Sequence, residues 1–312
     1  MSKSVIEPGA TVGFVGLGRM GRPMAARLAG AGYRVLGYDV SGPAAKAWAE
    51  HVADGGVAGR GAALAVSGLD EVADGAAAIV LMLPDSAVVT DVLISQGLLA
   101  ALPPGTVIVD MSSSAPRSTR ELAGQAAARG VALVDAPVSG GVRGAEQGSL
   151  TVMVGGAEAE VRRVAPLLDV MGGRVTHVGD VGAGHAVKAL NNLMSATHLL
   201  VTSEAMAAAA EFGLDIPTVL AAVNTSSGRS GSTENKWPNF IVPRTFDSGF
   251  ALRLMLKDMR IALDLAESAQ TPARLSAAAV ALWATAAEAL PPDADHTEIA
   301  RWLDPALRPE SP

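Results

Sequence analysis

An apolar run that leads directly into a glycine-rich turn constrains the fold of this chain more than any other feature. Residues 11–17, TVGFVGL, have the composition of a buried strand, and the glycines that follow are spaced Gly16-x-Gly18-x-x-Gly21. A helical pattern continues over about residues 20–31. A strand, a glycine turn and a helix in this order are typical of the first unit of a doubly wound parallel sheet.

The first half of the chain repeats this alternation of strands and helices. Further strands are expected at residues 33–39, 76–83, 106–110, 131–136, 149–156 and 174–179, with helices at 116–129 and 157–171. Parallel strands need a crossover between them, and a helix usually supplies it. We therefore expect an α/β fold whose N-terminal domain, residues 1–182, is a Rossmann domain with a doubly wound parallel sheet.

The strand pattern ends near residue 180, and the rest of the chain is helical. One long helix is expected from Gly184 to Glu211. Shorter helices are expected at 217–223, 251–269 and 272–289, and a long polar loop at 221–240. Residues 183–312 therefore form an all-helical second domain, which the long interdomain helix joins to the first. Its alanine-rich, apolar helices favour a homo-oligomer.

Composition excludes several classes of function. The net charge of −7 argues against nucleic-acid binding, which requires a basic surface. The chain has no cysteine, and its five histidines lack the spacing of a metal site, so no metal is expected. No apolar run approaches the ~20 residues that a membrane span needs. The first residues lack the apolar stretch of a signal peptide, so we expect a cytoplasmic protein.

The glycine turn predicts a dinucleotide site. Gly16 permits the tight turn, Gly18 lets the backbone approach a pyrophosphate, and Gly21 lets the helix pack closely on the strand. The helix N-terminus then offers N–H groups to the phosphates. The expected cofactor-binding residues here are Gly16, Leu17, Gly18, Arg19, Met20 and Gly21. The alternative interpretation is an ordinary glycine-rich turn.

Asp39 follows the second strand, 18 residues after Gly21. A carboxylate at this position accepts hydrogen bonds from the adenosine ribose and repels a 2′-phosphate, so NAD is favoured over NADP. Asp39 could instead be only a turn or helix-cap residue. Leu83, Pro84 and Ser113 follow later strands and are also placed to contact the cofactor, since ligands bind at the carboxyl ends of parallel strands.

The long helix begins with an unusual polar group. Lys188 and Asn192 are four residues apart among apolar neighbours and therefore share a helix face, with Asn191 close to it. Burial lowers the pKa of a lysine, and a lysine near neutrality exchanges a proton with a substrate hydroxyl. The alternative is a lysine that extends to solvent beside asparagine caps. His185 is interpreted as structural, and the role of Asn191 stays open.

The segment PVSGG, residues 137–141, directly follows the strand at 131–136 and contains Ser139, Gly140 and Gly141. Successive N–H groups in such a turn can form a nest that binds an anion, and a substrate carboxylate fits it. A flexible glycine turn is the alternative. Lys257 and Asp258 follow an apolar helix face, which favours a place in the site over a solvated charge pair.

Four segments together resemble the β-hydroxyacid dehydrogenase family, which includes 3-hydroxyisobutyrate dehydrogenase and tartronate semialdehyde reductase. They are VGFVGLGRMGRPMA, DAPVSGGVRGAEQGSLTVMVGG, GAGHAVKALNNLM and LMLKDMRIALDLA, and they span nearly the whole chain. The resemblance implies an NAD-dependent oxidoreductase that converts a small 3-hydroxy acid, such as 3-hydroxyisobutyrate, serine or a glycerate-like acid, into its semialdehyde. It also implies a homodimer or a homotetramer.

The resemblance also implies roles for individual residues. Lys188 is implied as the acid/base catalyst with Asn192 beside it, and Ser113 as a neighbour of the nicotinamide. Ser139, Gly140 and Gly141 are implied to hold the substrate carboxylate, Lys257 to contact the cofactor or substrate, and Phe250 and Asp258 to line the cavity.

Two residues depart from the pattern of the family. Val88 replaces a polar residue near the cofactor, and Gly231 stands where many members have a bulky aromatic residue that shapes the pocket. The physiological substrate therefore stays open. Two alternatives are an imine reductase-like enzyme, which usually lacks a lysine at the position of Lys188, and a non-catalytic dinucleotide-binding protein, which would not need this lysine.

Overall fold

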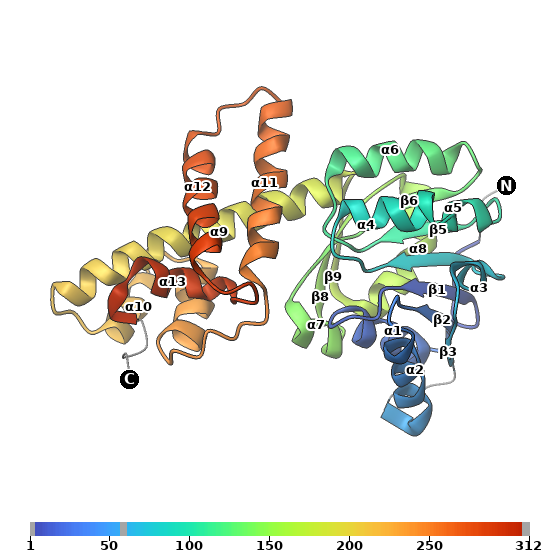
Figure 1. Cartoon of the computed structure of the whole chain (residues 1–312), viewed down its shortest axis with the longest axis horizontal. Helices are drawn as coiled ribbons and strands as arrows, with labels where there is room; N and C mark the ends of the chain where they lie inside the picture. Colours follow the sequence, from blue (N-terminus) through green and yellow to red (C-terminus); the bar gives the residue numbers. More distant parts are fainter. Residues whose placement is uncertain (1–3, 57–60, 308–312) are drawn as a thin grey trace. The chain divides into compact units, whose positions relative to one another are not determined.

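A computed structural model describes residues 4–56 and 61–307 of the chain. The chain divides into two compact units, Met1–Lys188 and Ala189–Pro312 (Figure 1). The first unit contains a sheet with helices, and the second contains helices (Figure 1). The α/β fold with a helical second part, expected from the sequence, is confirmed.

The first unit is built on one sheet with the strand order β3-β2-β1-β4-β5-β6-β8-β7, in which β9 also pairs with β8. The strands are β1 (Thr11–Val15), β2 (Arg34–Tyr38), β3 (Ala62–Ala65), β4 (Ala78–Leu81), β5 (Val107–Asp110), β6 (Ala132–Asp135), β7 (Val138–Ser139), β8 (Leu150–Gly155) and β9 (Gly172–Gly179). Strands β1 to β6 pair in parallel, whereas β8 is antiparallel to β6 and β7. The order reverses between β1 and β4, and this switch point is where doubly wound sheets bind ligands.

Helices bury both faces of this sheet, and this explains the nearly continuous apolar strands. Val12 and Phe14 of β1 point into one core, while Val15, the next residue along the strand, joins a second core on the opposite face. The helices of the unit are α1 (Gly21–Gly30), α2 (Gly42–His51), α3 (Leu69–Ala73), α4 (Ser86–Thr90), α5 (Leu98–Ala101), α6 (Pro116–Ala127), α7 (Gly141–Gln147) and α8 (Glu158–Met171). Leu28 of α1 packs in the first core, and Leu122 of α6 in the second.

Helix α9 (Ala183–Glu211) is the long helix expected from the sequence, and the division between the units falls within it. The proposed domain boundary after residue 182 places the whole helix in the second domain. The second unit continues with α10 (Ile216–Asn224), α11 (Leu252–Ser268), α12 (Arg274–Ala289) and α13 (Ile299–Leu303). Trp283 and Met259 are fully buried in its core.

The prediction of a long polar loop at residues 221–240 is wrong. Its first residues belong to α10, and Ser232–Ile241 forms a π-helix. Trp237 and Ile241 are buried in the core of the second unit, so these two apolar side chains anchor a segment whose polar composition suggested a loop. The side-chain amide of Asn224 also donates a hydrogen bond of 3.1 Å to the carbonyl oxygen of Thr233.

None of the helices in the described residues is long and apolar enough to cross a membrane. Within residues 4–56 and 61–307, no three His, Asp or Glu side chains are grouped so that they could hold a metal ion.

Candidate active site

The glycine turn after β1 has the shape that its sequence predicted. Gly16 has a φ of +96°, and a Cβ on it would overlap the carbonyl oxygen of Met82. A Cβ on Gly21, the first residue of α1, would overlap the carbonyl oxygen of Gly16. A Cβ on Gly18 would meet no atom within 4 Å. Gly16 and Gly21 are thus required by packing, whereas Gly18 borders an open space that a diphosphate can occupy.

Asp39 lies directly beyond β2 and is bonded to this turn. Its Oδ2 accepts a hydrogen bond of 2.8 Å from the backbone N–H of Leu17, and its Oδ1 accepts one of 2.8 Å from the N–H of Ser41. The half-buried carboxylate is therefore held beside the glycine turn by backbone donors.

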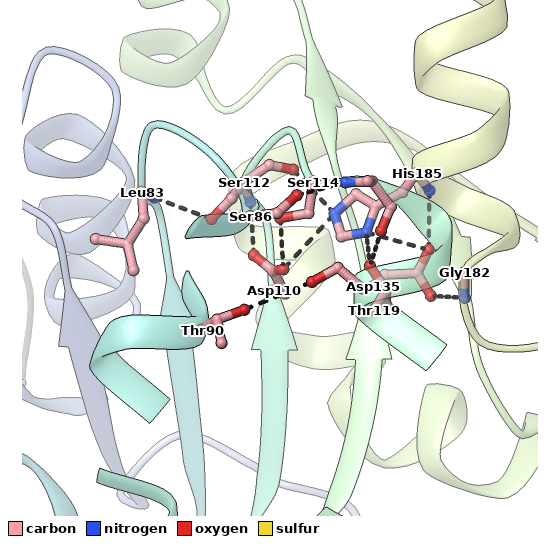
Figure 2. A network of polar contacts seen from close by, with 12 residues as sticks. Leu83, Ser86, Thr90, Asp110, Ser112, Ser114, Thr119, Asp135, Gly182 and His185 are labelled. Carbon is pink, nitrogen blue, oxygen red and sulfur yellow. Dashed lines mark hydrogen bonds and ion pairs between the residues drawn. The ribbon is translucent and has the colours of Figure 1, made fainter. Parts of the chain in front are cut away.

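A polar network connects the carboxyl ends of β4 and β5 (Figure 2). Asp110, the last residue of β5, is buried, and its two oxygens accept hydrogen bonds from the N–H of Ser112 at 3.0 Å and the hydroxyl of Ser114 at 3.1 Å. The Ser112 hydroxyl accepts one of 3.0 Å from the N–H of Leu83 beyond β4. The loop that carries Ser113, a predicted cofactor contact, is thus held by the buried carboxylate of Asp110 and by the hydrogen bond between Leu83 and Ser112.

Asp135 fixes the start of α9 to the end of β6 (Figure 2). Its side chain is fully buried. Its two oxygens accept backbone hydrogen bonds of 2.6 Å from Gly182 and 2.8 Å from His185. A carboxylate at a helix N-terminus satisfies N–H groups that have no partner within the helix, and the helix dipole favours its charge. Lys188, three residues beyond His185, therefore belongs to a helix that starts at the carboxyl edge of the sheet.

The side chain of His185 links this helix to the β5 loop (Figure 2). Its Nδ1 lies 2.8 Å from the hydroxyl of Thr119, and its Nε2 lies 3.0 Å from the carbonyl oxygen of Ser112. Because a carbonyl oxygen only accepts, Nε2 must carry a hydrogen and donate it. Carboxylate oxygens of Asp110 and Asp135 each lie 3.8 Å from a ring nitrogen. The interpretation of His185 as structural is consistent with its burial, but its contacts place it at the centre of the site network.

The turn predicted to bind a carboxylate follows strand β7. Gly140 and Gly141 have φ values of +131° and +63°, and Ser139 before them is the last residue of β7. A Cβ on Gly141 would meet nothing within 4 Å. The backbone here thus has two successive positive φ angles, which glycine adopts without strain, and it is open to a ligand.

Lys188 and Asn192 are both buried, with exposed fractions of 7% and 5%. The amide of Asn192 donates a hydrogen bond of 2.6 Å to Oδ2 of Asp258, whose other oxygen lies 3.4 Å from the ammonium of Lys257. Asn191 donates one of 3.1 Å to the side-chain oxygen of Asn192. The structure thus brings together four of these residues, Asn191, Asn192, Lys257 and Asp258, in one chain of polar contacts.

Phe250 lies apart from that chain of contacts. Its ring is 5.8 Å from the ring of His296 in an edge-to-face arrangement, just before α11. Leu17 is buried, Met20 is half-buried and Arg19 is exposed on the glycine turn. Leu83 contributes its N–H to the network, and Pro84 follows it.

Three residues important to this geometry were missed in the sequence. Asp110 and Asp135 each end an apolar strand, VIVD and LVD, and an acid in such a place is a recognisable signal because burying it requires partners. Lys236 gave no signal, because it lies in the segment interpreted as a loop. Its ammonium donates a hydrogen bond of 2.7 Å to the hydroxyl of Ser195.

A second buried titratable cluster lies in the second unit. Burial lowers the pKa of Lys236 to about 8, although Asp295 opposes the shift. Burial and the charge of Lys236 lower the pKa of His296 to about 4. Burial raises the pKa of Asp295, but hydrogen bonds from Thr297 and the charge of His296 outweigh this effect and leave it below its ordinary value.

Comparisons with known proteins agree with this geometry. Residues 11–179 match the family described as the NAD binding domain of 6-phosphogluconate dehydrogenase. Residues 182–303 match the family described as NAD-binding of NADP-dependent 3-hydroxyisobutyrate dehydrogenase.

Individual proteins are similar over nearly the whole chain. The 2-(hydroxymethyl)glutarate dehydrogenase of Eubacterium barkeri is 39% identical over 89% of both chains. The NAD-dependent L-serine dehydrogenase of Pseudomonas aeruginosa is 35% identical over 94% of this chain and 98% of its own. The structure of Mycobacterium tuberculosis 3-hydroxyisobutyrate dehydrogenase with L-serine aligns with a TM-score of 0.85 and 33% identity, covering 94% of this chain and 99% of that one.

A dinucleotide-binding Rossmann unit followed by a helical unit defines an oxidoreductase of the NAD(P)-dependent class. The chain belongs to the β-hydroxyacid dehydrogenase family. The resemblance expected from four sequence segments is confirmed, and so is the prediction of a hydroxyacid dehydrogenase.

Proposed function

We propose that the protein transfers a hydride between NAD and a small 3-hydroxy acid, giving the semialdehyde, with Lys188 as general acid/base. One observation carries this proposal. Buried Lys188 lies in the second turn of a helix whose first turn is bonded to Asp135, at the carboxyl edge of the parallel strands. Substrates of doubly wound enzymes bind at this edge.

The residues of the glycine turn fit a dinucleotide. The open side of Gly18 accepts the pyrophosphate, and the start of α1, which has no side-chain cap, offers its N–H groups. Asp39 accepts the ribose hydroxyls, and its charge is the reason we propose NAD rather than NADP. Leu83, Pro84 and Ser113 lie beyond β4 and β5, where the nicotinamide half would bind.

The chemistry follows from the position of Lys188. NAD supplies the hydride acceptor when it is bound. In oxidation, the neutral amine of Lys188 takes the proton of the substrate hydroxyl, and in reduction its ammonium returns that proton to the aldehyde oxygen.

The other residues orient the substrate and the lysine. The backbone of Ser139, Gly140 and Gly141 holds the carboxylate of the acid. Asn192, held by Asp258, presents a fixed side chain one helical turn beyond Lys188 and restrains the substrate hydroxyl. Lys257 and Phe250 are proposed as further contacts to cofactor and substrate.

Relatives indicate the range of substrates. Proteins named as dehydrogenases of 2-(hydroxymethyl)glutarate, L-serine and 3-hydroxyisobutyrate are similar to this chain. In each of these compounds, the carbon that carries a carboxylate also carries a hydroxymethyl group. We propose this pattern for the substrate. The homodimer or homotetramer and the cytoplasmic location stay predictions.

A substrate panel tests the proposal. NADH formation is followed at alkaline pH with 3-hydroxyisobutyrate, L-serine, glycerate and 2-hydroxy acids, with NAD and NADP in parallel. We expect turnover of 3-hydroxy acids and a higher kcat/KM with NAD. Turnover confined to 2-hydroxy acids would contradict the placing of the carboxylate and the lysine.

A further inference from the structure

The glycine turn carries a run of backbone donors without protein partners. In the part of the chain that the structure describes, four successive N–H groups donate no hydrogen bond to the protein, those of Gly18, Arg19, Met20 and Gly21. A Cβ on Gly18 would meet no atom within 4 Å, so the space beside this residue is open. The orientation of the peptide bond between Leu17 and Gly18 decides whether the first of these donors is available to a ligand.

Two side chains hold the backbone of Leu17. Its N–H donates a hydrogen bond of 2.8 Å to Oδ2 of Asp39. Its carbonyl oxygen accepts one of 2.9 Å from Nε of Arg22, the second residue of α1. A peptide bond is planar and trans, so the N–H of Gly18 points away from the carbonyl oxygen of Leu17. By holding this oxygen, Arg22 fixes the direction of the Gly18 N–H.

The peptide bond between Leu17 and Gly18 has little intrinsic preference for this orientation. Glycine adopts φ angles of either sign at similar cost, so the peptide bond before Gly18 can turn over easily. After such a turnover, the carbonyl oxygen of Leu17 would take the place of the Gly18 N–H. A carbonyl oxygen only accepts hydrogen bonds and repels a phosphate, whereas an N–H donates to it. The turned-over state would therefore bind a diphosphate poorly.

The location of Arg22 is unfavourable for a residue that serves only helix stability. The macrodipole of a helix is positive at its N-terminus and disfavours a cation there. The first turn of α1 contains no acidic residue that would offset this charge. The side chain of Arg22 is also exposed, so it adds little to the core. A role in ordering the glycine turn accounts for an arginine at this position.

We propose that Arg22 is a positioning residue for the cofactor, whose Nε–H locks the peptide bond between Leu17 and Gly18 in the orientation that offers the Gly18 N–H to the diphosphate. This inference rests on the proposed function, because it takes the glycine turn as the NAD site. Arg22 acts through the backbone and raises affinity by preorganising it. Asp39 cannot prevent the turnover, since the N–H that it holds belongs to the preceding peptide bond.

Two substitutions separate the hydrogen bond from the charge. The side-chain nitrogen of glutamine is as many bonds from Cα as the Nε of arginine, and the terminal methyl group of methionine takes the same place. Arg22→Gln therefore keeps an N–H donor without the charge, whereas Arg22→Met removes both. Arg34→Met is the control for net charge, because Arg34 is exposed and pairs with Thr11, at the end of β1 away from the turn.

The affinities for ADP-ribose and adenosine are measured by competition with NADH in fluorescence titrations, since ADP-ribose contains the diphosphate and adenosine does not. Loss of a hydrogen bond from a charged donor predicts that Arg22→Met binds ADP-ribose about 10- to 100-fold more weakly. Arg22→Gln and Arg34→Met should stay within about threefold of wild type. Adenosine affinity, and kcat at saturating NAD, should stay within about twofold in all three variants.

Each competing explanation predicts a different result. Equal weakening by Arg22→Gln and Arg22→Met would show attraction by the charge and overturn the inference, as would wild-type affinity in Arg22→Met. An equal loss for adenosine and ADP-ribose would show general damage to the turn and also overturn it. Arg22→Ala decides the question if the methionine variant does not fold. A wild-type protein that binds neither NADH nor ADP-ribose would contradict the proposed function itself.

Discussion

Replacing His185 by leucine should loosen the start of α9 and slow catalysis without removing a residue that touches the substrate. The imidazole of His185 is the donor to the carbonyl oxygen of Ser112 and a partner of the Thr119 hydroxyl, and all three groups are buried. Leucine leaves that carbonyl oxygen without a donor. The single hydrogen of the Thr119 hydroxyl can then be donated to the carbonyl oxygen of Ala115, which lies 3.1 Å away.

The magnitude follows from these contacts. A buried carbonyl oxygen without a donor costs about 1–3 kcal/mol, and the lost Thr119 contact about 1 kcal/mol more, which gives about 2–4 kcal/mol. If this loss lowers the opening free energy of α9, the amides of its second turn should exchange about 30- to 1000-fold faster. Because Lys188 lies three residues away, a displacement near 1 Å should lower kcat by up to about 100-fold.

Hydrogen exchange on a peptide spanning residues 182–190 and steady-state kinetics measure the two effects. KM for NAD should change less than kcat, because the glycine turn is untouched. His185→Gln is the control, since its amide can donate to Ser112 and accept from Thr119, and it should retain most of the protection and of kcat. Wild-type exchange and kcat in the leucine variant would refute the positioning role.

Three further predictions concern other parts of the chain. Asp39→Asn keeps an acceptor for Leu17 but removes the charge, so the ratio of kcat/KM for NAD to that for NADP should fall at least about tenfold; an unchanged ratio would exclude this role for Asp39. A Cβ on Gly18 would meet no protein atom within 4 Å, so in Gly18→Ala the melting temperature should stay within a few degrees while NADH affinity, by fluorescence titration, falls by about tenfold or more; full affinity would contradict the phosphate site. His296 has a pKa of about 4 in the folded chain against 6.5 in the unfolded chain, so the unfolded chain binds more protons between these values. The free energy of unfolding should therefore fall by on the order of 3 kcal/mol as the pH drops from 7 to 4, an effect that His296→Asn should reduce in denaturant titrations; an equal pH dependence in both proteins would contradict it.

Much of the first unit follows from local sequence signals. The apolar runs are buried on both faces, so their strands are visible as continuous hydrophobic segments, and Gly16 and Gly21 are required by backbone contacts that any such turn makes. These features depend on neighbours in the sequence.

The network around His185 could not be predicted in the same way. Asp110, Asp135 and Thr119 meet the histidine from three separate elements, 75, 50 and 66 residues away in the chain. Only the sheet brings them together, because adjacent parallel strands place their last residues at one edge. Each acid could have been flagged singly, but its partner could not.

The prediction for residues 232–241, which form a π-helix instead of a loop, failed for a different reason. Its composition is polar, and two apolar anchors, Trp237 and Ile241, decide its structure through tertiary packing. The helix propensities of its residues do not predict a helix. Packing within the second unit overrides these propensities. The contact between Lys236 and Ser195 was missed for the same reason.

The most direct test of the proposed mechanism separates cofactor binding from hydride transfer in Lys188→Ala. Single-turnover oxidation of 3-hydroxyisobutyrate, or of the best acid in the panel, is followed by NADH absorbance, and NADH affinity is measured by fluorescence titration. Loss of a general acid/base should lower the rate of hydride transfer about 100- to 10,000-fold, while the Kd for NADH stays within about twofold. Near-wild-type hydride transfer in this variant would contradict the assignment of Lys188 as the acid/base catalyst.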